Sequence, residues 1–230
     1  MIAIRKNSER GHFDHGWLNT YHTFSFGDYD DPKNMGFRTL RVINEDIVAP
    51  GEGFPTHSHH DMEIITYILA GELAHKDSIG NEETIKTGEL QRMSAGRGVQ
   101  HSEYNASKKQ ACHLLQIWIL PAERNIEPGY EQKIFEDSGE ALQLVVAPTS
   151  RNGNLTLNQD TEIYLGRLQK NGRAEYTLKT GRHVWIQTAK GSLAINGIKL
   201  EQGDGAAVSN ESKLAVESSA GCEFLLFDLN

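Results

Sequence analysis

Short apolar stretches recur along the chain, and turns that contain glycine separate them. Val, Ile, Leu, Thr and Tyr dominate these stretches, while long stripes with the 3.6-residue helical period are scarce. We therefore predict an all-β fold, with strands at residues 40–43, 63–69, 72–77, 83–86, 113–120, 142–146, 183–188, 192–195 and 223–228. Little helix is expected, and its one candidate position is a short turn or helix at residues 130–138.

Turn residues and an internal duplication indicate how these strands are organised. Asn196-Gly197 is a favoured pair for a two-residue hairpin turn. Residues 63–90 and 183–205 share one order: strand, glycine, strand, turn, strand, and then glycine followed by an acid. Two similar units predict two stacked antiparallel β-barrels, which leave no exposed strand edges. Because Pro and Gly interrupt residues 121–129, we expect an N-terminal domain at 1–125 and a C-terminal domain at 126–230.

Composition narrows the classes of function. The chain has 230 residues, of which 38% are hydrophobic and 23% charged, as is typical of a globular protein. A formal net charge of −8 disfavours binding to nucleic acid or to an anionic membrane, since both favour a basic surface. Cys112 and Cys222 lie in apolar stretches, so free thiols are expected rather than a disulfide. No signal-peptide pattern or membrane-length apolar stretch is present, which makes a cytoplasmic monomer the default expectation.

The spacing of a few histidines indicates a metal site. His57 and His59 are two residues apart, and His101 and Glu103 repeat this spacing. On an extended strand such residues share one face, about 6–7 Å apart, so both can approach one ion. Neither pair is specific when taken alone, because polar residues on a surface loop can have the same spacing. Together the two pairs offer three nitrogens and one carboxylate oxygen to a metal ion in the N-terminal domain.

The segments around these pairs resemble the two cupin motifs. Residues 51–71 contain glycine, five residues, the HxH pair, three residues, Glu63 and a closing glycine one position later than usual. Residues 88–105 contain Gly98, His101 and Asn105 in the second motif, with serine in place of the usual proline. A closer resemblance, to the pirin family, is carried by residues 57–81, 93–105 and 115–121. The opening stretch 16–26 resembles the bacterial pirin-like branch that includes quercetin 2,3-dioxygenases.

This resemblance implies a bicupin, two stacked jelly-roll β-barrels, with metal ligands at His57, His59, His101 and Glu103. Glu63 is a ligand in many other cupins, whereas in pirin-like proteins its position is a supporting or structural one, and a solvent-facing position is the remaining alternative. His60 and His75 are candidates for orienting the ligands. The C-terminal half has no HxH pair after His183, so we expect no metal site there.

The ligand set lacks thiolates, which argues against a structural zinc site or an iron–sulfur cluster. The resemblance implies iron(II) as first choice, with zinc, nickel, copper or manganese as alternatives. It also implies a dioxygenase that opens a flavonol such as quercetin with O2 and releases carbon monoxide, with Glu103 as proton acceptor. Four apolar side chains could line a pocket for this aromatic substrate or simply pack in the core: Phe24, Phe26, Met35 and Phe37. The alternative function is a regulatory, redox-sensing metal protein that acts through a protein partner without turnover.

Overall fold

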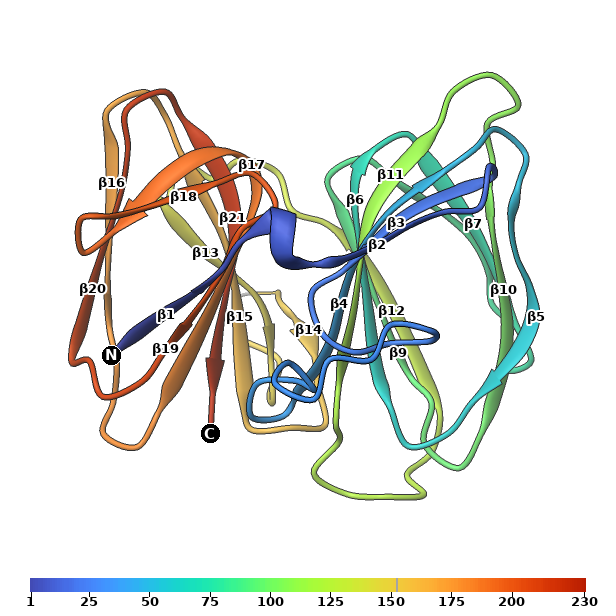
Figure 1. Ribbon diagram of the computed structural model, residues 1–230. Coiled ribbons are helices and arrows are strands. Elements are labelled where there is room, and N and C mark those ends of the chain that lie inside the picture. Colours follow the sequence, from blue (N-terminus) through green and yellow to red (C-terminus); the bar gives the residue numbers. More distant parts are fainter. Residues whose placement is uncertain (152) are drawn as a thin grey trace. The chain divides into compact units, whose positions relative to one another are not determined.

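The computed structural model describes residues 1–151 and 153–230, which form two compact units of β-strands (Figure 1). The N-terminal unit contains Gly11–Glu136 and Leu155–Gln159. The C-terminal unit contains Met1–Arg10, Asp137–Asn154 and Asp160–Asn230. The helix of the described chain is the 3-10 turn η1 (Asn7–Glu9), and no described helix has the length and apolar character needed to cross a membrane.

Two antiparallel sheets face each other in the N-terminal unit (Figure 1). The larger sheet contains, in spatial order, β12 (Gly129–Ile134), β9 (Glu89–Ser94), β6 (Glu63–Ala70), β11 (Cys112–Ile119), β4 (Leu40–Val48), β3 (Leu18–His22) and β2 (Gly11–Asp14). The smaller sheet contains β5 (Gly53–His59), β10 (Val99–Asn105), β7 (Glu72–Asp77) and β8 (Glu82–Lys86). The residues with the metal-ligand spacing therefore lie in the smaller sheet.

Apolar side chains from both sheets fill the space between them. In β6, seven of eight residues are buried, because this strand lies in the middle of the larger sheet. Leu73 and Ile85 of the smaller sheet pack in one cluster with Ile68 and Leu114 of the larger sheet. Full burial of one such side chain contributes about 1.5–3 kcal/mol. This cluster therefore fixes the two sheets against each other and sets the frame in which the histidines lie.

The long strand β17 (His183–Ile195) connects the two layers of the C-terminal unit. Its first half pairs with β19 (Gly205–Val208) and β21 (Cys222–Leu229), and its last residues pair with β18 (Ile198–Glu201) and β20 (Lys213–Ser218). Gly191 lies where β17 passes from one layer to the other. Only glycine suits this position, because its φ is 73° and a Cβ there would stand 2.5 Å from the carbonyl oxygen of Gly221.

The remaining strands extend these layers. β1 (Ile2–Arg5) pairs with β19, β15 (Thr161–Leu168) with β21, β13 (Leu142–Ala147) with β15, and β16 (Gly172–Thr177) with β20. Ile186, Phe224 and Leu226 belong to the core cluster of this unit. β14 (Leu155–Thr156) lies in the N-terminal unit, where the backbone N–H of Thr156 donates to Glu131 of β12 at 2.8 Å.

The all-β prediction is confirmed, and every predicted strand is present. Residues 183–188 and 192–195 are parts of one strand, β17, and Asn196 and Gly197 both have positive φ in the hairpin that follows it. The turn or helix expected at residues 130–138 is wrong, because β12 forms there and pairs with β9. Each unit is a β-sandwich, with two separate sheets in the N-terminal unit and one continuous sheet, folded into two layers, in the C-terminal unit; no pairing among the described residues closes either unit into a barrel. The compact units also differ from the expected division at 125/126, because β1 pairs in the C-terminal unit and β12 in the N-terminal unit.

Candidate metal centre

Three neighbouring strands of the smaller sheet, β5, β10 and β7, carry the candidate ligands. His101 on β10 lies opposite His57 on β5 and Asp77 on β7, while Glu103 lies opposite His75 on β7. Buried and more exposed side chains alternate along β10, and His101 and Glu103 both occupy buried positions. The spacing of two residues therefore turns these two side chains toward the interior of the unit.

A β-bulge shapes the strand that carries His57. The pairing of β5 with β10 shifts between His57 and Phe54, so β5 has one extra residue there, and Pro55 lies within this bulge. Proline is tolerated because β5 is an edge strand. At Gly53, a Cβ would stand 2.2 Å from the carbonyl oxygen of Glu103. The backbones of β5 and β10 thus lie close together beside Glu103.

The imidazoles of His57, His59 and His101 come together. Nε2 of His101 lies 3.0 Å from Nε2 of His57. The ring centroid of His59 lies 4.7 Å from that of His57 and 4.8 Å from that of His101. Nδ1 of His57 lies 2.8 Å from the carbonyl oxygen of Pro55, which favours a proton on Nδ1 and leaves Nε2 as the lone-pair donor.

Burial favours the neutral form of these imidazoles. His101 is 1% exposed, and its burial, followed by the charges of His57 and His59, lowers its pKa to about 2. Burial, and then the charge of His57, lowers the pKa of His59 to about 4. Both rings are therefore neutral at pH 7, and neutral imidazole is the form that binds a metal ion.

Glu103 is a buried acid, 2% exposed, that the larger sheet holds in place. Gln116 on β11 donates Nε2 to Oε2 of Glu103 at 2.9 Å, and the hydroxyl of Thr66 on β6 donates to Oε1 of Gln116 at 3.0 Å. Burial, and then the charge of Asp46, raises the pKa of Glu103 to about 7. A carboxylate in such surroundings is stabilised in its ionised form by a nearby cation.

The donor set fits a divalent transition metal ion. Two ligand atoms held about 2.1 Å from one ion, at a right angle, stand about 3.0 Å apart. The Nε2 atoms of His57 and His101 have this separation, 3.0 Å. Two groups of possible ligands occur among the described residues, and both lie in the N-terminal unit: His57, His59 and His101, and His75, His101 and Glu103. Imidazole and carboxylate without thiolate suit iron, nickel, copper, zinc and manganese.

Both halves of the chain match known families. Residues 3–119 match the Pirin family, and residues 144–229 match the quercetinase C-terminal cupin domain. The chain belongs to the pirin family.

Relatives of this pirin match it over its full length. A quercetin 2,3-dioxygenase of Escherichia coli is 49% identical over 229 residues, which are 100% of this chain and 99% of that protein. A pirin-like protein of Caulobacter vibrioides is 35% identical over 231 residues, 99% of each chain. The crystal structure of the bacterial pirin YhhW of Escherichia coli in complex with nickel(II) matches with a TM-score of 0.96 and 48% identity, covering 100% of this chain and 99% of that one.

His75 lies in the candidate site of this pirin, although sequence reasoning gave it only a general supporting role. Its buried ring lies 5.3 Å from the ring of His101, and its Nε2 lies 3.0 Å from Oδ2 of Asp77. Its Nδ1 has no hydrogen-bond partner among the described residues. His75-Lys76-Asp77 has the same spacing as the two ligand pairs. This spacing was the available signal that His75 and Asp77 share the inner face of β7.

Two other residues considered from the sequence lie outside both groups of possible ligands. Glu63 is fully buried and accepts hydrogen bonds from Ser94 Oγ at 2.9 Å and from the backbone N–H of Asn158 at 3.2 Å. It holds the 155–159 segment against β6, so the solvent-facing alternative for Glu63 is wrong. His60 is exposed, and its Nδ1 lies 3.0 Å from Oδ2 of Asp61.

A row of aromatic rings extends from Phe26 through Trp118 to His59. The ring of Trp118 stands edge-to-face against His59, with centroids 4.9 Å apart, and Phe26 stands edge-to-face against Trp118 at 5.2 Å. The other apolar candidates differ in exposure: Phe24 is buried, Phe37 half-buried and Met35 exposed. Sequence reasoning missed Trp118, because nothing in the run 115–121 indicates which side chain faces the histidines.

Proposed function

We propose that this pirin is a metal-dependent dioxygenase that opens the ring of a flavonol such as quercetin with O2 and releases carbon monoxide. In this proposal His57, His59, His101 and Glu103 hold one divalent transition metal ion, with iron(II) as first choice. The observation that carries it is the convergence of three imidazole nitrogens in the unit where Glu103 is buried. Full-length similarity to a protein named quercetin 2,3-dioxygenase, and to a pirin crystallised with nickel(II), supports the same assignment.

The side chains around Glu103 suit it to move a proton. When bound, the metal would act as a Lewis acid that makes the flavonol 3-hydroxyl more acidic. O2 would react with the flavonol ring next to this hydroxyl. Glu103 would accept that proton on its carboxylate, since it is the buried acid in the same group as His101. Gln116 fixes Oε2 by its hydrogen bond of 2.9 Å, so the carboxylate keeps one orientation while it ligates and accepts the proton.

The aromatic residues next to His59 would recognise a flat substrate. Trp118 lies against His59, and Phe26 lies against Trp118. An aromatic pair contributes about 0.5–1.5 kcal/mol beyond the burial of its area. A flavonol ring packed against Trp118 would therefore be held beside the imidazoles, and water would be excluded from that side of the ring.

The test combines metal analysis with turnover. The full chain is loaded anaerobically with iron(II), and O2 uptake, loss of flavonol absorbance and carbon monoxide are measured with quercetin. His101→Ala should bind less metal and lose turnover, because a buried ligand is removed. His12→Ala is the matched control: His12 is exposed, hydrogen-bonds Asn19 at 3.1 Å and belongs to neither group of possible ligands. This variant should retain the wild-type rate.

Equal O2 uptake by wild type and His101→Ala would contradict the proposal. Uptake of O2 without carbon monoxide would contradict the ring-opening reaction while leaving the metal site in place. Tight metal binding with no turnover of quercetin would favour the alternative, a regulatory protein, which should then bind a protein partner in a metal-dependent manner.

A further inference from the structure

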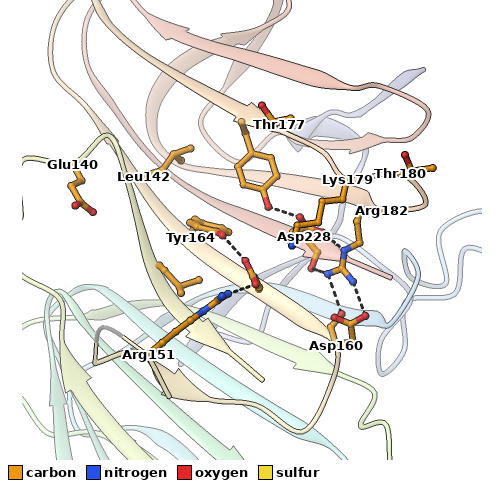
Figure 2. A pocket seen from close by; sticks show the side chains of 13 residues that line it. Glu140, Leu142, Arg151, Asp160, Tyr164, Thr177, Lys179, Thr180, Arg182 and Asp228 are labelled. Carbon is orange, nitrogen blue, oxygen red and sulfur yellow. Dashed lines mark hydrogen bonds and ion pairs between the residues drawn. The ribbon is translucent and has the colours of Figure 1, made fainter. Parts of the chain in front are cut away.

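A cavity of about 750 Å³ opens in the C-terminal unit (Figure 2). Strands β13, β15, β16 and β21 and the turn after β16 contribute its walls. Its volume falls in the range of about 300–1,000 Å³ that is typical of small-molecule pockets. None of its lining residues belongs to a group of possible metal ligands, so a molecule bound in this cavity would be held independently of the metal centre.

Two tyrosines on the cavity wall each donate their hydroxyl proton to a carboxylate. Tyr164 donates to Oε2 of Glu162 at 2.5 Å, and Tyr176 donates to Oδ2 of Asp228. The two rings stand edge-to-face with centroids 5.3 Å apart. Because both protons are already engaged, the phenol oxygens offer lone pairs to a bound molecule.

Arginines neutralise the same carboxylates. Nε of Arg182 donates to Oδ1 of Asp228 at 2.5 Å, and its NH1 donates to Oδ2 of Asp160 at 2.8 Å (Figure 2). Arg151 donates to Glu162. The side chain of Asp228 is 7% exposed, so separating it from Arg182 would leave a buried charge uncompensated. The cavity lining carries four carboxylates and three cationic side chains, so its charges nearly cancel, and this balance favours a neutral ligand over an ionic one.

The wall combines apolar surface with both kinds of hydrogen-bonding group. Leu142 and Leu144 provide apolar surface beside the tyrosine rings. The phenol and carboxylate oxygens accept hydrogen bonds, while the exposed Lys179 and the remaining N–H groups of Arg151 donate them. A ligand complementary to this wall donates and accepts many hydrogen bonds, carries no net charge and has a C–H face. We propose that the cavity binds a neutral, hydroxyl-rich small molecule of the monosaccharide and polyol class.

The experiment is saturation-transfer NMR on the full chain with four probes: D-glucose, D-galactose, L-rhamnose and myo-inositol. At least one probe should receive saturation, and Tyr176→Phe and Lys179→Ala should each weaken its affinity by about tenfold, as expected for the loss of one hydrogen bond of about 1.4 kcal/mol. The matched controls remove the same groups outside the cavity. Tyr21→Phe and Lys170→Ala should keep the wild-type affinity, because neither residue lines the cavity.

Each remaining outcome overturns the proposal. No saturation of any probe excludes this ligand class, and equal affinity in wild type and Lys179→Ala places the probes elsewhere. Tighter binding of citrate or spermidine, displaced by none of the four probes, assigns the cavity to an ionic ligand. Should Tyr176→Phe fail to fold, Lys179→Ala alone decides, because Lys179 is exposed.

Discussion

At the scale of single residues, Gln116 sets the orientation of Glu103. Replacing it in Gln116→Leu keeps the approximate volume and removes the hydrogen bond of 2.9 Å to Oε2. Loss of such a partner typically lowers metal affinity about 10–100-fold. We expect that loss for nickel(II), measured by competition with a chelator, with the fold retained. The exposed Gln202→Leu is the control, and an unchanged affinity in Gln116→Leu would argue against Glu103 as a ligand.

At Gly53 the backbone of β5 lies close to the backbone of β10 at Glu103. A Cβ in Gly53→Ala would stand 2.2 Å from the carbonyl oxygen of Glu103 and 2.5 Å from Cα of Tyr104, so the strands must separate. Such overpacking costs about 1–3 kcal/mol. We expect a lower urea midpoint together with weaker metal binding. In the control Gly129→Ala the nearest atom is the end of the Arg92 side chain at 3.2 Å, and equal midpoints for both variants would contradict the argument.

At the scale of elements, a buried carboxylate joins the segment after β1 to the turn before β19. Asp204 accepts hydrogen bonds from Nζ of Lys6 at 2.8 Å and from the backbone N–H groups of Asn7 and Glu201 at 2.7 and 3.0 Å. Burial raises the pKa of Asp204, but the hydrogen bonds from Lys6, Glu201 and Asn7 outweigh it, so the pKa lies below its usual value. The ionised form is therefore part of the folded structure.

Because its pKa is lower in the folded chain, Asp204 stabilises the fold at pH values above its unfolded pKa, near 3.8, and this stabilisation is lost as pH falls through the folded pKa. Asp204→Asn should lower the free energy of unfolding by about 1–3 kcal/mol at neutral pH. The difference from wild type should shrink in acid, as measured by urea unfolding across a pH series. The exposed Asp30→Asn is the control, and a difference that does not vary with pH would contradict this role.

Strands with clear alternation or continuous apolar runs could be predicted from the sequence, and others could not. Apolar β-branched runs indicate β6 and β11, whereas the sequence of β12, Gly-Tyr-Glu-Gln-Lys-Ile, is polar and forms a strand only because β9 pairs with it. The i, i+2 spacing predicted the shared face of His101 and Glu103. It could not predict the partner strand that brings His75 opposite Glu103, since register is a property of the folded sheet.

At the scale of the whole molecule, the same order of strands and glycine turns occurs in both units, with different functional side chains. Gly71 and Gly191 both have positive φ, 82° and 73°. A Cβ at Gly71 would stand 2.7 Å from the carbonyl oxygen of Ala111, and a Cβ at Gly191 would stand 2.5 Å from that of Gly221. These equivalent close approaches explain the glycines of the duplicated pattern. The N-terminal unit carries the clustered imidazoles, while the C-terminal unit carries the cavity lined by tyrosine and carboxylate side chains.

This difference between the units predicts where a metal ion stabilises the molecule. A ligand at 100 times its dissociation constant stabilises the state that binds it by about 2.7 kcal/mol. Amide exchange in the central strands β6 and β11 should therefore slow by up to about 100-fold with nickel(II), while exchange in β15 and β21 stays unchanged. Hydrogen exchange read by mass spectrometry measures both, with His101→Ala as the control that should lose the effect. Equal slowing in both units would mean that they unfold as one cooperative structure, and slowing in β15 and β21 alone would place the metal outside the histidine cluster.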